Sequence, residues 1–213
     1  MRKMFVFLGD IVASKKITRE KSFQKRLESA CRLVNERFRE EIHSDFKIIK
    51  GIDEIGGVLK SPYSLYMMID TMLKEIHPYR MRMVLVFDYI DVGLETGDVS
   101  RMDGPSFHRA SMMIEELKKT KLMFRMSVKD KLLDSLIEGQ INLILLLKGQ
   151  WSEKKHRIIE EYEKYLNQRK VAKILKLTQQ AVSKSITSSY WKEIKLIEER
   201  LNEAIKLYPG NYR

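Results

Sequence analysis

The N-terminal half of the chain alternates short apolar runs, typical of buried strands, with longer amphipathic stretches, typical of helices. The predicted strands are residues 4–9, 46–49, 55–59 and 83–87. The predicted helices are residues 20–43 and a segment from Pro62 to about Ile76. The acid-bearing turn 51–54 joins the second and third strands into a hairpin. The order strand, helix, hairpin, helix, strand predicts an α+β domain, an α/β sandwich with its helices on one face of the sheet.

The C-terminal half of the chain is predicted to be helical. After the polar loop 96–105, the predicted helices are residues 106–119, 129–148, 153–165 and 191–207. Ser152 precedes one of these helices and is a residue type that caps helix N-termini. A domain boundary is therefore expected at 149–152, so that domain 1–149 is followed by an all-α domain 150–213.

The last predicted helix carries an apolar stripe, formed by Ile194, Ile197, Leu201, Ala204 and Ile205. Side chains three and four residues apart share one face of a helix, and an apolar face requires a partner. Two partners are open: the rest of the same domain, with Trp191 as an anchor, or the same helix of a second subunit. The second alternative predicts a homodimer.

Residues 168–190 have the pattern of a helix-turn-helix DNA-binding motif. Leu177 fills the expected turn, and Thr178 is placed to cap the second helix. The expected inner, apolar positions are Val171, Ala172, Leu175, Val182 and Ile186. The expected outward, DNA-contacting residues are Arg169, Lys170, Lys173, Thr178, Gln179, Gln180, Ser183, Lys184 and Thr187. Such side chains contact base edges and phosphates in a major groove. The alternative is a structural helical hairpin, which Lys176 favours because glycine is frequent at this turn position.

The charge of the chain suits a polyanionic partner. Forty basic and 29 acidic residues give a net charge of +11, with a pI near 9.6. Many basic proteins bind no nucleic acid, so the distribution of the charge carries more weight than its sum. No acidic residue occurs between Glu163 and Glu193, whereas basic residues recur throughout this stretch. The local excess predicts DNA as the partner of the C-terminal domain.

Membrane and secreted classes do not fit the sequence. The nearest candidate for a membrane span, Ile141–Leu147, is far shorter than the roughly 20 residues that cross a bilayer. Gly9 and Asp10 interrupt the apolar N-terminus too early for a signal peptide. The lone Cys31 excludes an intramolecular disulfide and is typical of a reducing compartment. We therefore expect a cytoplasmic protein without a membrane partner.

Three polar motifs occur in the predicted α+β domain, at residues 8–15 (LGDIVASK), 52–57 (IDEIGG) and 103–108 (DGPSFH). Asp10 ends the first strand and Asp53 lies in the hairpin turn, so the two carboxylates meet if the strands are neighbours. Paired acids at a sheet end suit Mg²⁺ with a phosphate-bearing ligand. The alternative is that both are turn-forming or capping acids. His108 is either a helix-start residue packed under its loop or a ligand contact beside the same sheet end.

The three motifs, in this order and at these intervals, resemble the SatD family over most of residues 4–115. The family pattern is G-D-I-x-x-S-K, then G-D-E-F-x-G, then D-G-P-x-[YF]-H, from which Ile52 and Ile55 depart. The motif residues Ser14, Lys15, Glu54, Asp103 and His108 are thereby candidate ligand contacts. Many members of the family carry a C-terminal helix-turn-helix, as is expected here.

The same motif order is more distantly similar to the ferredoxin-like palm fold of class III nucleotidyl cyclases and diguanylate cyclases. Their acids at the positions of Asp10 and Asp53 hold two metal ions, which implies Mg²⁺ and a nucleotide ligand. His108 and Met112 stand where cyclases have Asn and, four residues on, a charge-stabilising Arg, and Ile49 replaces the purine-selecting Lys. Loss of such an Arg costs several kcal/mol of barrier, which argues against cyclase activity and favours a retained metal or nucleotide site.

The sequence thus predicts a DNA-binding protein of the transcriptional-regulator class, with a degenerate palm-like domain that senses a nucleotide or metal. The alternative is a Mg²⁺-dependent nucleotidyl transferase or cyclase whose basic tail recruits nucleic acid.

Overall fold

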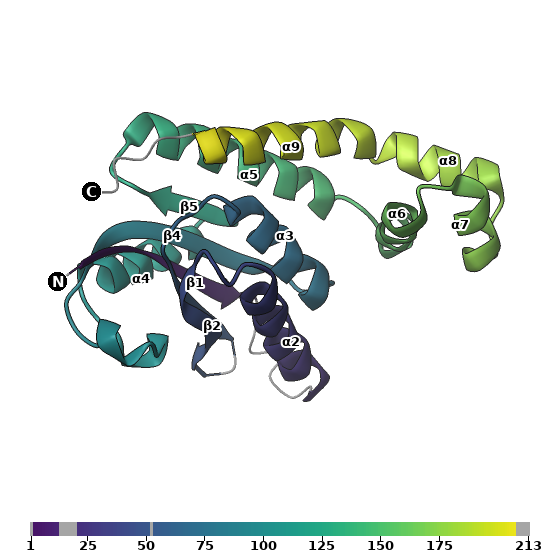
Figure 1. Cartoon of the computed structure of the whole chain (residues 1–213). Helices are drawn as coiled ribbons and strands as arrows, with labels where there is room; N and C mark the ends of the chain where they lie inside the picture. The colour runs from purple at the N-terminus through teal and green to yellow at the C-terminus, as the bar shows by residue number, and fades with distance from the viewer. Residues whose placement is uncertain (1, 13–20, 52, 208–213) are drawn as a thin grey trace. The chain divides into compact units, whose positions relative to one another are not determined.

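The chain folds into two compact units, which the computed structural model describes for residues 2–12, 21–51 and 53–207 (Figure 1). The first unit comprises residues 1–142 and 202–213, and the second comprises residues 143–201. The division therefore falls inside two helices rather than at the expected linker 149–152. No helix in the described part of the chain is long and apolar enough to cross a membrane.

The first unit is built on one five-stranded sheet. Its strands are β1 (Arg2–Ile11), β2 (Ile42–Lys50), β3 (Glu54–Leu59), β4 (Met81–Ile90) and β5 (Phe124–Ser127). Their order is β2-β3-β1-β4-β5, and all neighbours are antiparallel except the parallel pair β4–β5. The central strand β1 is buried without interruption from Met4 to Ile11. Burial on both faces explains why its sequence is a continuous apolar run instead of an alternating one.

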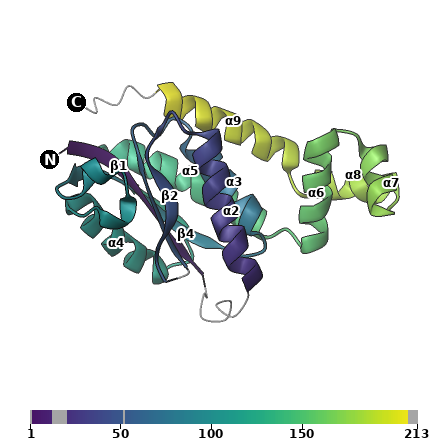
Figure 2. The same ribbon diagram turned by 60° about the horizontal axis from the view of Figure 1, so that its bottom comes forward.

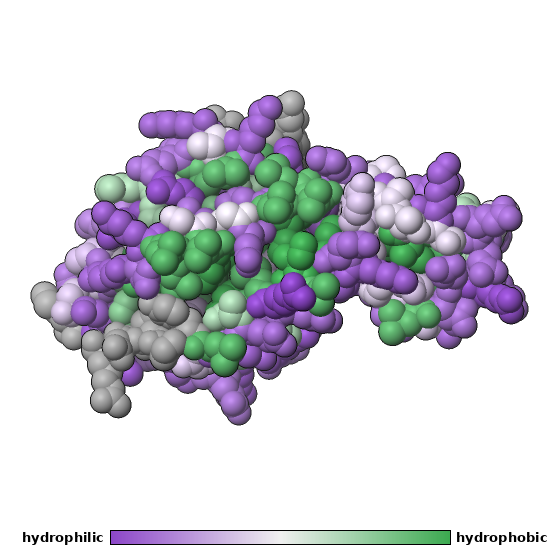
Figure 3. All heavy atoms as spheres, turned by 90° about the horizontal axis from the view of Figure 1, so that it is seen from above, coloured by the Kyte–Doolittle hydropathy of each residue, from purple (hydrophilic) through white to green (hydrophobic). Residues whose placement is uncertain are grey.

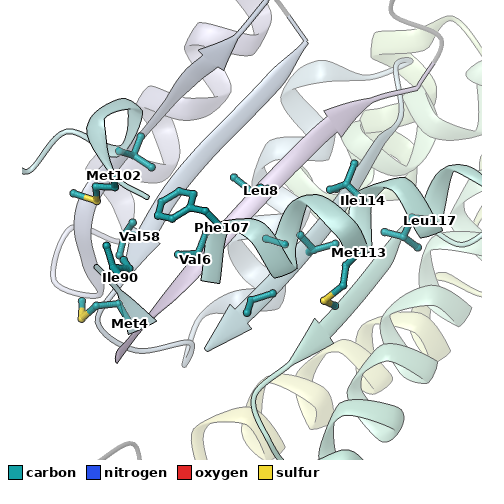
Figure 4. Close-up of a cluster of buried hydrophobic side chains, with 14 residues drawn as sticks. Met4, Val6, Leu8, Val58, Ile90, Met102, Phe107, Met113, Ile114 and Leu117 are labelled. Carbon is teal, nitrogen blue, oxygen red and sulfur yellow. The ribbon is translucent and has the colours of Figure 1, made fainter. Parts of the chain in front are cut away.

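Helices cover both faces of the sheet, so the expectation of helices on one face was wrong. Helix α4 (Pro105–Lys118) packs on β1 and β4, where Met4, Val6 and Leu8 point into its apolar cluster (Figure 4). Successive strand residues point to opposite faces, so Phe5 and Phe7 face the other way. Helices α2 (Lys21–Arg37) and α3 (Leu65–Ile76) lie on that side (Figures 1 and 2). Apolar side chains on both sides of β1 require both layers.

The sequence pattern did not predict β5, a four-residue strand at the edge of the sheet. Helix α5 (Lys131–Gly149) covers this edge through three polar side chains at four-residue intervals. Backbone N–H groups donate to these side chains as follows: Val128 to Asp134 (2.9 Å), Met126 to Glu138 (2.7 Å) and Phe124 to Asn142 (3.1 Å). Four helical residues rise about 6 Å and two strand residues about 6.6 Å, so the two spacings match. We call this set of hydrogen bonds the α5–β5 ladder.

The second unit contains three short helices around their own apolar core. They are α6 (Glu153–Tyr165), α7 (Gln168–Leu175) and α8 (Gln179–Ser188). The core consists of Ile158, Ile159, Val171, Ala172, Val182 and Ile186, with Leu175 and Leu177 packed against it. The inner positions expected for residues 168–190 are thus confirmed. Ser152 and Thr178 cap α6 and α8 through their hydroxyl oxygens, which accept from the N–H groups of Lys155 and Ala181.

Most of the apolar stripe of the last helix, α9 (Trp191–Leu207), is buried within the chain, although Ile197 is half-buried and Ala204 is exposed. Ile194, Leu201 and Ile205 are between 1% and 3% exposed, so they cannot meet the same helix of a second subunit. The reading as internal core is confirmed for these three residues, and their use as a two-fold contact was wrong. The homodimer itself stays a prediction, and it requires another surface.

Replacing Asn142 with alanine should lower the free energy of unfolding by about 2–4 kcal/mol. The Asn142 amide oxygen accepts from Met123 and Phe124, and its amide nitrogen donates to the Phe124 carbonyl, so alanine leaves buried backbone groups without partners. Urea denaturation measures the loss. The exposed Gln140→Ala on the same helix is the matched control and should change stability by no more than about 0.5 kcal/mol. If Asn142→Ala and Gln140→Ala lower the free energy of unfolding equally, the hydrogen bonds of Asn142 do not stabilise the β5 edge of the sheet.

Candidate functional site

Asp10 lies at the C-terminal end of β1 between two cationic side chains. Its Oδ2 atom is 3.2 Å from Nη1 of Arg82, the residue that pairs with it on β4. Its Oδ1 atom is 3.3 Å from Nζ of Lys118, the last residue of α4. The Asp10 side chain is only 13% exposed. Both carboxylate oxygens are therefore neutralised by the chain itself in a largely dry environment.

Glu54, and not Asp53, lies beside Asp10. The two residues are paired directly across β1 and β3, and directly opposed residues point to the same face of a sheet. Asp53 precedes Glu54 in the turn, where its carbonyl oxygen accepts from the N–H of Ile11 (3.0 Å). Burial raises the pKa of Glu54; Lys50 and Lys118 oppose this shift, and the negative charges of Asp10 and Asp53 add to it. The expected Asp10–Asp53 pair is thus replaced by Asp10 and Glu54.

These residues do not fit the two-metal site that the resemblance to cyclases implies. Divalent cations need several oxygen ligands whose lone pairs face the ion. The oxygens of Asp10 face Arg82 and Lys118 instead. Within the described ranges, no group of three or more His, Cys, Asp or Glu side chains is placed to hold a metal. Ser14 and Lys15, the other candidates from the first motif, lie outside the described residues.

Asp103 and His108 lie at the opposite end of the sheet from Asp10. The backbone N–H of Asp91, just beyond β4, donates to the Asp103 carbonyl, whereas Asp10 pairs with Arg82 near the start of β4. From Arg82 to the end of β4 is about 26 Å, at roughly 3.3 Å per residue. His108 Nε2 is 3.0 Å from Oδ1 of Asp103, and both side chains are exposed. The expectation that His108 stands beside the acids was therefore wrong, because α4 starts at one end of the sheet and finishes at the other.

The outward surface of α7 and α8 carries the residues expected to contact DNA. All of them lie outside the core, and only Ser183 among them is half-buried. Nε of Arg169 donates to Oε1 of Gln179 (3.4 Å), which joins the two helices at their surface. The Lys170 ammonium lies over the ring of Tyr165, 3.8 Å from its centroid. Neither helix carries an acidic side chain.

An open hollow of about 570 Å³ follows one side of α8. Its lining residues are Gln180, Ser183, Lys184, Thr187, Ser188 and Tyr190. Tyr190 was not among the expected contacts. It is 61% exposed and takes a left-handed backbone conformation (φ 54°) between α8 and α9. Its exposure depends on this turn, which the spacing of apolar residues does not reveal.

A family model described as the SatD family matches residues 4–206. The chain belongs to the SatD family. The match extends well beyond the three motifs, so the helical unit is part of what this SatD-family chain shares with its family. No curated protein matches the chain.

Two solved structures that match this SatD-family chain are described as bacterial light-regulated adenylyl cyclases. Both are 12% identical to it, with TM-scores of 0.45 and 0.42 over 60% and 59% of its length. The matched part spans 43% of each of those chains, which is less than half of their length.

Replacing Asp10 with asparagine should lower the free energy of unfolding by about 1–3 kcal/mol, because Arg82 and Lys118 lose their shared anion. The loss stays below that of a fully buried pair because Lys118 is 37% exposed. Chemical denaturation measures it, with the exposed Asp45→Asn as the matched control. Vacant metal sites behave in the opposite way, since removing one of their repelling carboxylates stabilises the fold. If the Asp10→Asn variant is more stable and the melting temperature of the wild type rises in millimolar Mg²⁺, the interpretation as a metal site is supported instead.

The pKa of Glu54 predicts a pH-dependent stability. The folded state raises this pKa, so the charged form carries a penalty at neutral pH that disappears as the pH falls below the ordinary value of 4.5. Glu54→Gln should therefore raise the melting temperature at pH 7, and the gain should shrink towards pH 4. The exposed Glu40→Gln is the control and should show no such trend. A gain that is equal at both pH values would contradict the burial of the Glu54 charge.

Proposed function

We propose that this SatD-family chain binds double-stranded DNA through α8 and acts as a transcriptional regulator. The observation that carries the proposal is the outward face of α8, which presents neutral polar and basic side chains without any acid. The opposite face of the same helix is anchored by Val182 and Ile186, which are buried in the core of the second unit. A rigid helix with one free polar face has the form that a major groove admits.

The spacing of the polar residues supports direct contact with base edges. Gln179, Gln180, Ser183, Lys184 and Thr187 recur at intervals of three and four, so they line one side of a helix about 15 Å long. Glutamine binds adenine through its amide, and lysine binds the guanine acceptors. Of these residues, Ser183 lies nearest the core and the others are exposed. The most exposed residues are therefore also those best suited to discriminate bases.

Helix α7 supplies positive charge beside this face. Arg169, Lys170 and Lys173 are exposed, and Lys176 ends the helix in the left-handed conformation (φ 52°) that the turn requires. Basic side chains next to a reading helix contact phosphates, which fixes the helix on the duplex but carries no sequence information. The two helices thus divide affinity and specificity between them.

The alternative of a Mg²⁺-dependent nucleotidyl transferase or cyclase stays a prediction for the first unit. Asp10 is held by Arg82 and Lys118, and no catalytic step follows from that arrangement. A nucleotide-sensing role of the same unit likewise stays a prediction.

Substitutions on α7 should lower the affinity for all DNA, whereas substitutions on α8 should lower the discrimination between DNA sequences. Arg169→Ala and Lys173→Ala should weaken binding to all duplexes, and each should reduce the slope of log K against log salt by about 0.9. Gln180→Ala should instead cost about 1–3 kcal/mol of discrimination at one base pair, with little change in the salt slope. Fluorescence anisotropy over a salt series, with a selected duplex and a scrambled duplex, measures both quantities.

The matched control is Lys25→Ala, which removes the same charge from an exposed position on α2. It should leave DNA affinity nearly unchanged. Wild-type protein that binds no selected duplex at low salt would overturn the proposal. So would a loss of affinity in Lys25→Ala equal to that in Lys173→Ala, because binding would then follow net charge and not the α7–α8 surface.

A further inference from the structure

The outward side of α5 is apolar and almost without charge. Four leucines on it are exposed: Leu132 (71%), Leu136 (58%), Leu143 (54%) and Leu146 (46%). Together with Gly139 they form what we call the α5 outer face. Figure 3 looks onto the side on which α5 lies in Figure 1, where apolar side chains gather at the surface. Contiguous exposed apolar patches of this kind mark interaction sites on proteins.

The α5–β5 ladder determines which side of α5 faces outward. Asp134, Glu138 and Asn142 turn towards β5, so both acidic side chains of the helix are used there. The isoleucines of the same helix, Ile137, Ile141 and Ile144, are buried. The α5 outer face is what remains, and it cannot rotate inward without breaking the ladder.

Gly139 lies in the middle of the α5 outer face, and the fold of the single chain does not require a glycine there. A Cβ atom at this position would meet no atom within 4 Å. Glycine in a helix interior is unfavourable relative to alanine, so a glycine without a local role points to a role elsewhere. Because glycine has no side chain, the backbone of another helix can approach closely at this position. The position therefore suits a helix crossing.

The spacing of the α5 outer face makes it complementary to itself. Its residues recur at intervals of four, three, four and three, with Gly139 in the centre. In an antiparallel pair with a two-fold axis near Gly139, Leu136 meets Leu143 of the second copy, and Leu132 meets Leu146 of the second copy. Residue i then contacts j while j contacts i, as an isologous interface requires.

Charge also favours the antiparallel arrangement. In that arrangement Lys131, the first residue of α5, lies beside the C-terminal turn of the second copy's α5. The C-terminus of a helix carries a partial negative charge, which attracts a cation. An antiparallel pair also sets opposite helix ends side by side, whereas a parallel pair would set like ends together. No exposed charge within the α5 outer face opposes contact between two copies.

We propose that the α5 outer face binds a second copy of this chain as an antiparallel helix pair crossing at Gly139. A single helix pair lies at the lower end of known interface sizes, so the dimer should be weak in solution. Two copies bound to one DNA molecule would be held together more firmly through their high effective concentration. The dimer does not depend on DNA binding, and it is tested without DNA.

Cysteine cross-linking tests the geometry directly. Gly139→Cys should form a disulfide-linked dimer under mild oxidation, because the copies cross at this residue. The natural Cys31 is buried and should not react. Leu132→Cys should not link to itself, since the two copies of residue 132 lie roughly 21 Å apart along the axis. It should link to Leu146→Cys when the two variants are mixed. The control Met112→Cys, 62% exposed on α4, should give no dimer.

Sedimentation equilibrium tests the association of the unlinked chain. Wild-type protein should show a mass that rises with concentration, and Leu136→Glu with Leu143→Glu should weaken the dimer at least tenfold. Met112→Glu is the control and should behave as wild type, with circular dichroism confirming that each variant is folded. A wild-type chain that stays monomeric at all concentrations, with no disulfide through Gly139→Cys, would overturn the inference. Self-linking of Leu132→Cys would overturn it as well, because it would require a parallel pair.

Discussion

The α5–β5 ladder is the interaction on which the edge of the sheet and the orientation of α5 depend. An edge strand leaves a row of backbone N–H groups without partners, and buried N–H groups without partners cost about 1–3 kcal/mol each. Here Asp134, Glu138 and Asn142 supply the acceptors, because their four-residue spacing matches alternate residues of the strand. Burial raises the pKa of both Asp134 and Glu138. The fold accepts this penalty at neutral pH and thereby gains a covered edge and a fixed orientation of α5.

The charge cluster around Asp10, at the C-terminal end of β1, is stabilised differently. Asp10 would be a strongly unfavourable buried charge if it stood alone, and buried ion pairs are favourable only when their geometry is good. Arg82 and Lys118 approach its two oxygens from a strand and from a helix end, so the cluster joins β1, β4 and α4. A sheet end that could have been arranged around ions is instead balanced by the protein's own cations. The first unit is therefore held together at this end of the sheet by charges of its own chain.

In the second unit, the residues that hold the helices together are distinct from the polar residues on the surface of α8. Its core side chains hold α7 and α8 together, and the Thr178 hydroxyl begins α8 at a defined residue. Lys195 and Glu198 on α9 form ion pairs with Glu163 on α6 and Lys148 on α5, which tie these helices together within the unit. The polar face of α8 can consequently vary without loss of the fold.

The sequence by itself determined the strong local features of this chain. Helix periodicity, the caps at Ser152 and Thr178, the inner positions of α7 and α8, and most strands follow from side-chain spacing and backbone chemistry, which act between near neighbours. Tertiary structure alone decided the rest. The strand β5 is only four residues long, too short for its apolar–polar alternation to mark it as a strand, and it exists because β4 and α5 satisfy its backbone on two sides. The neighbours of Asp10, the position of His108, the burial of the α9 stripe and the exposure of the α5 outer face depend on strand register and helix direction. Strand register and helix direction are set by contacts between residues far apart in the sequence. A local sequence pattern therefore does not predict them.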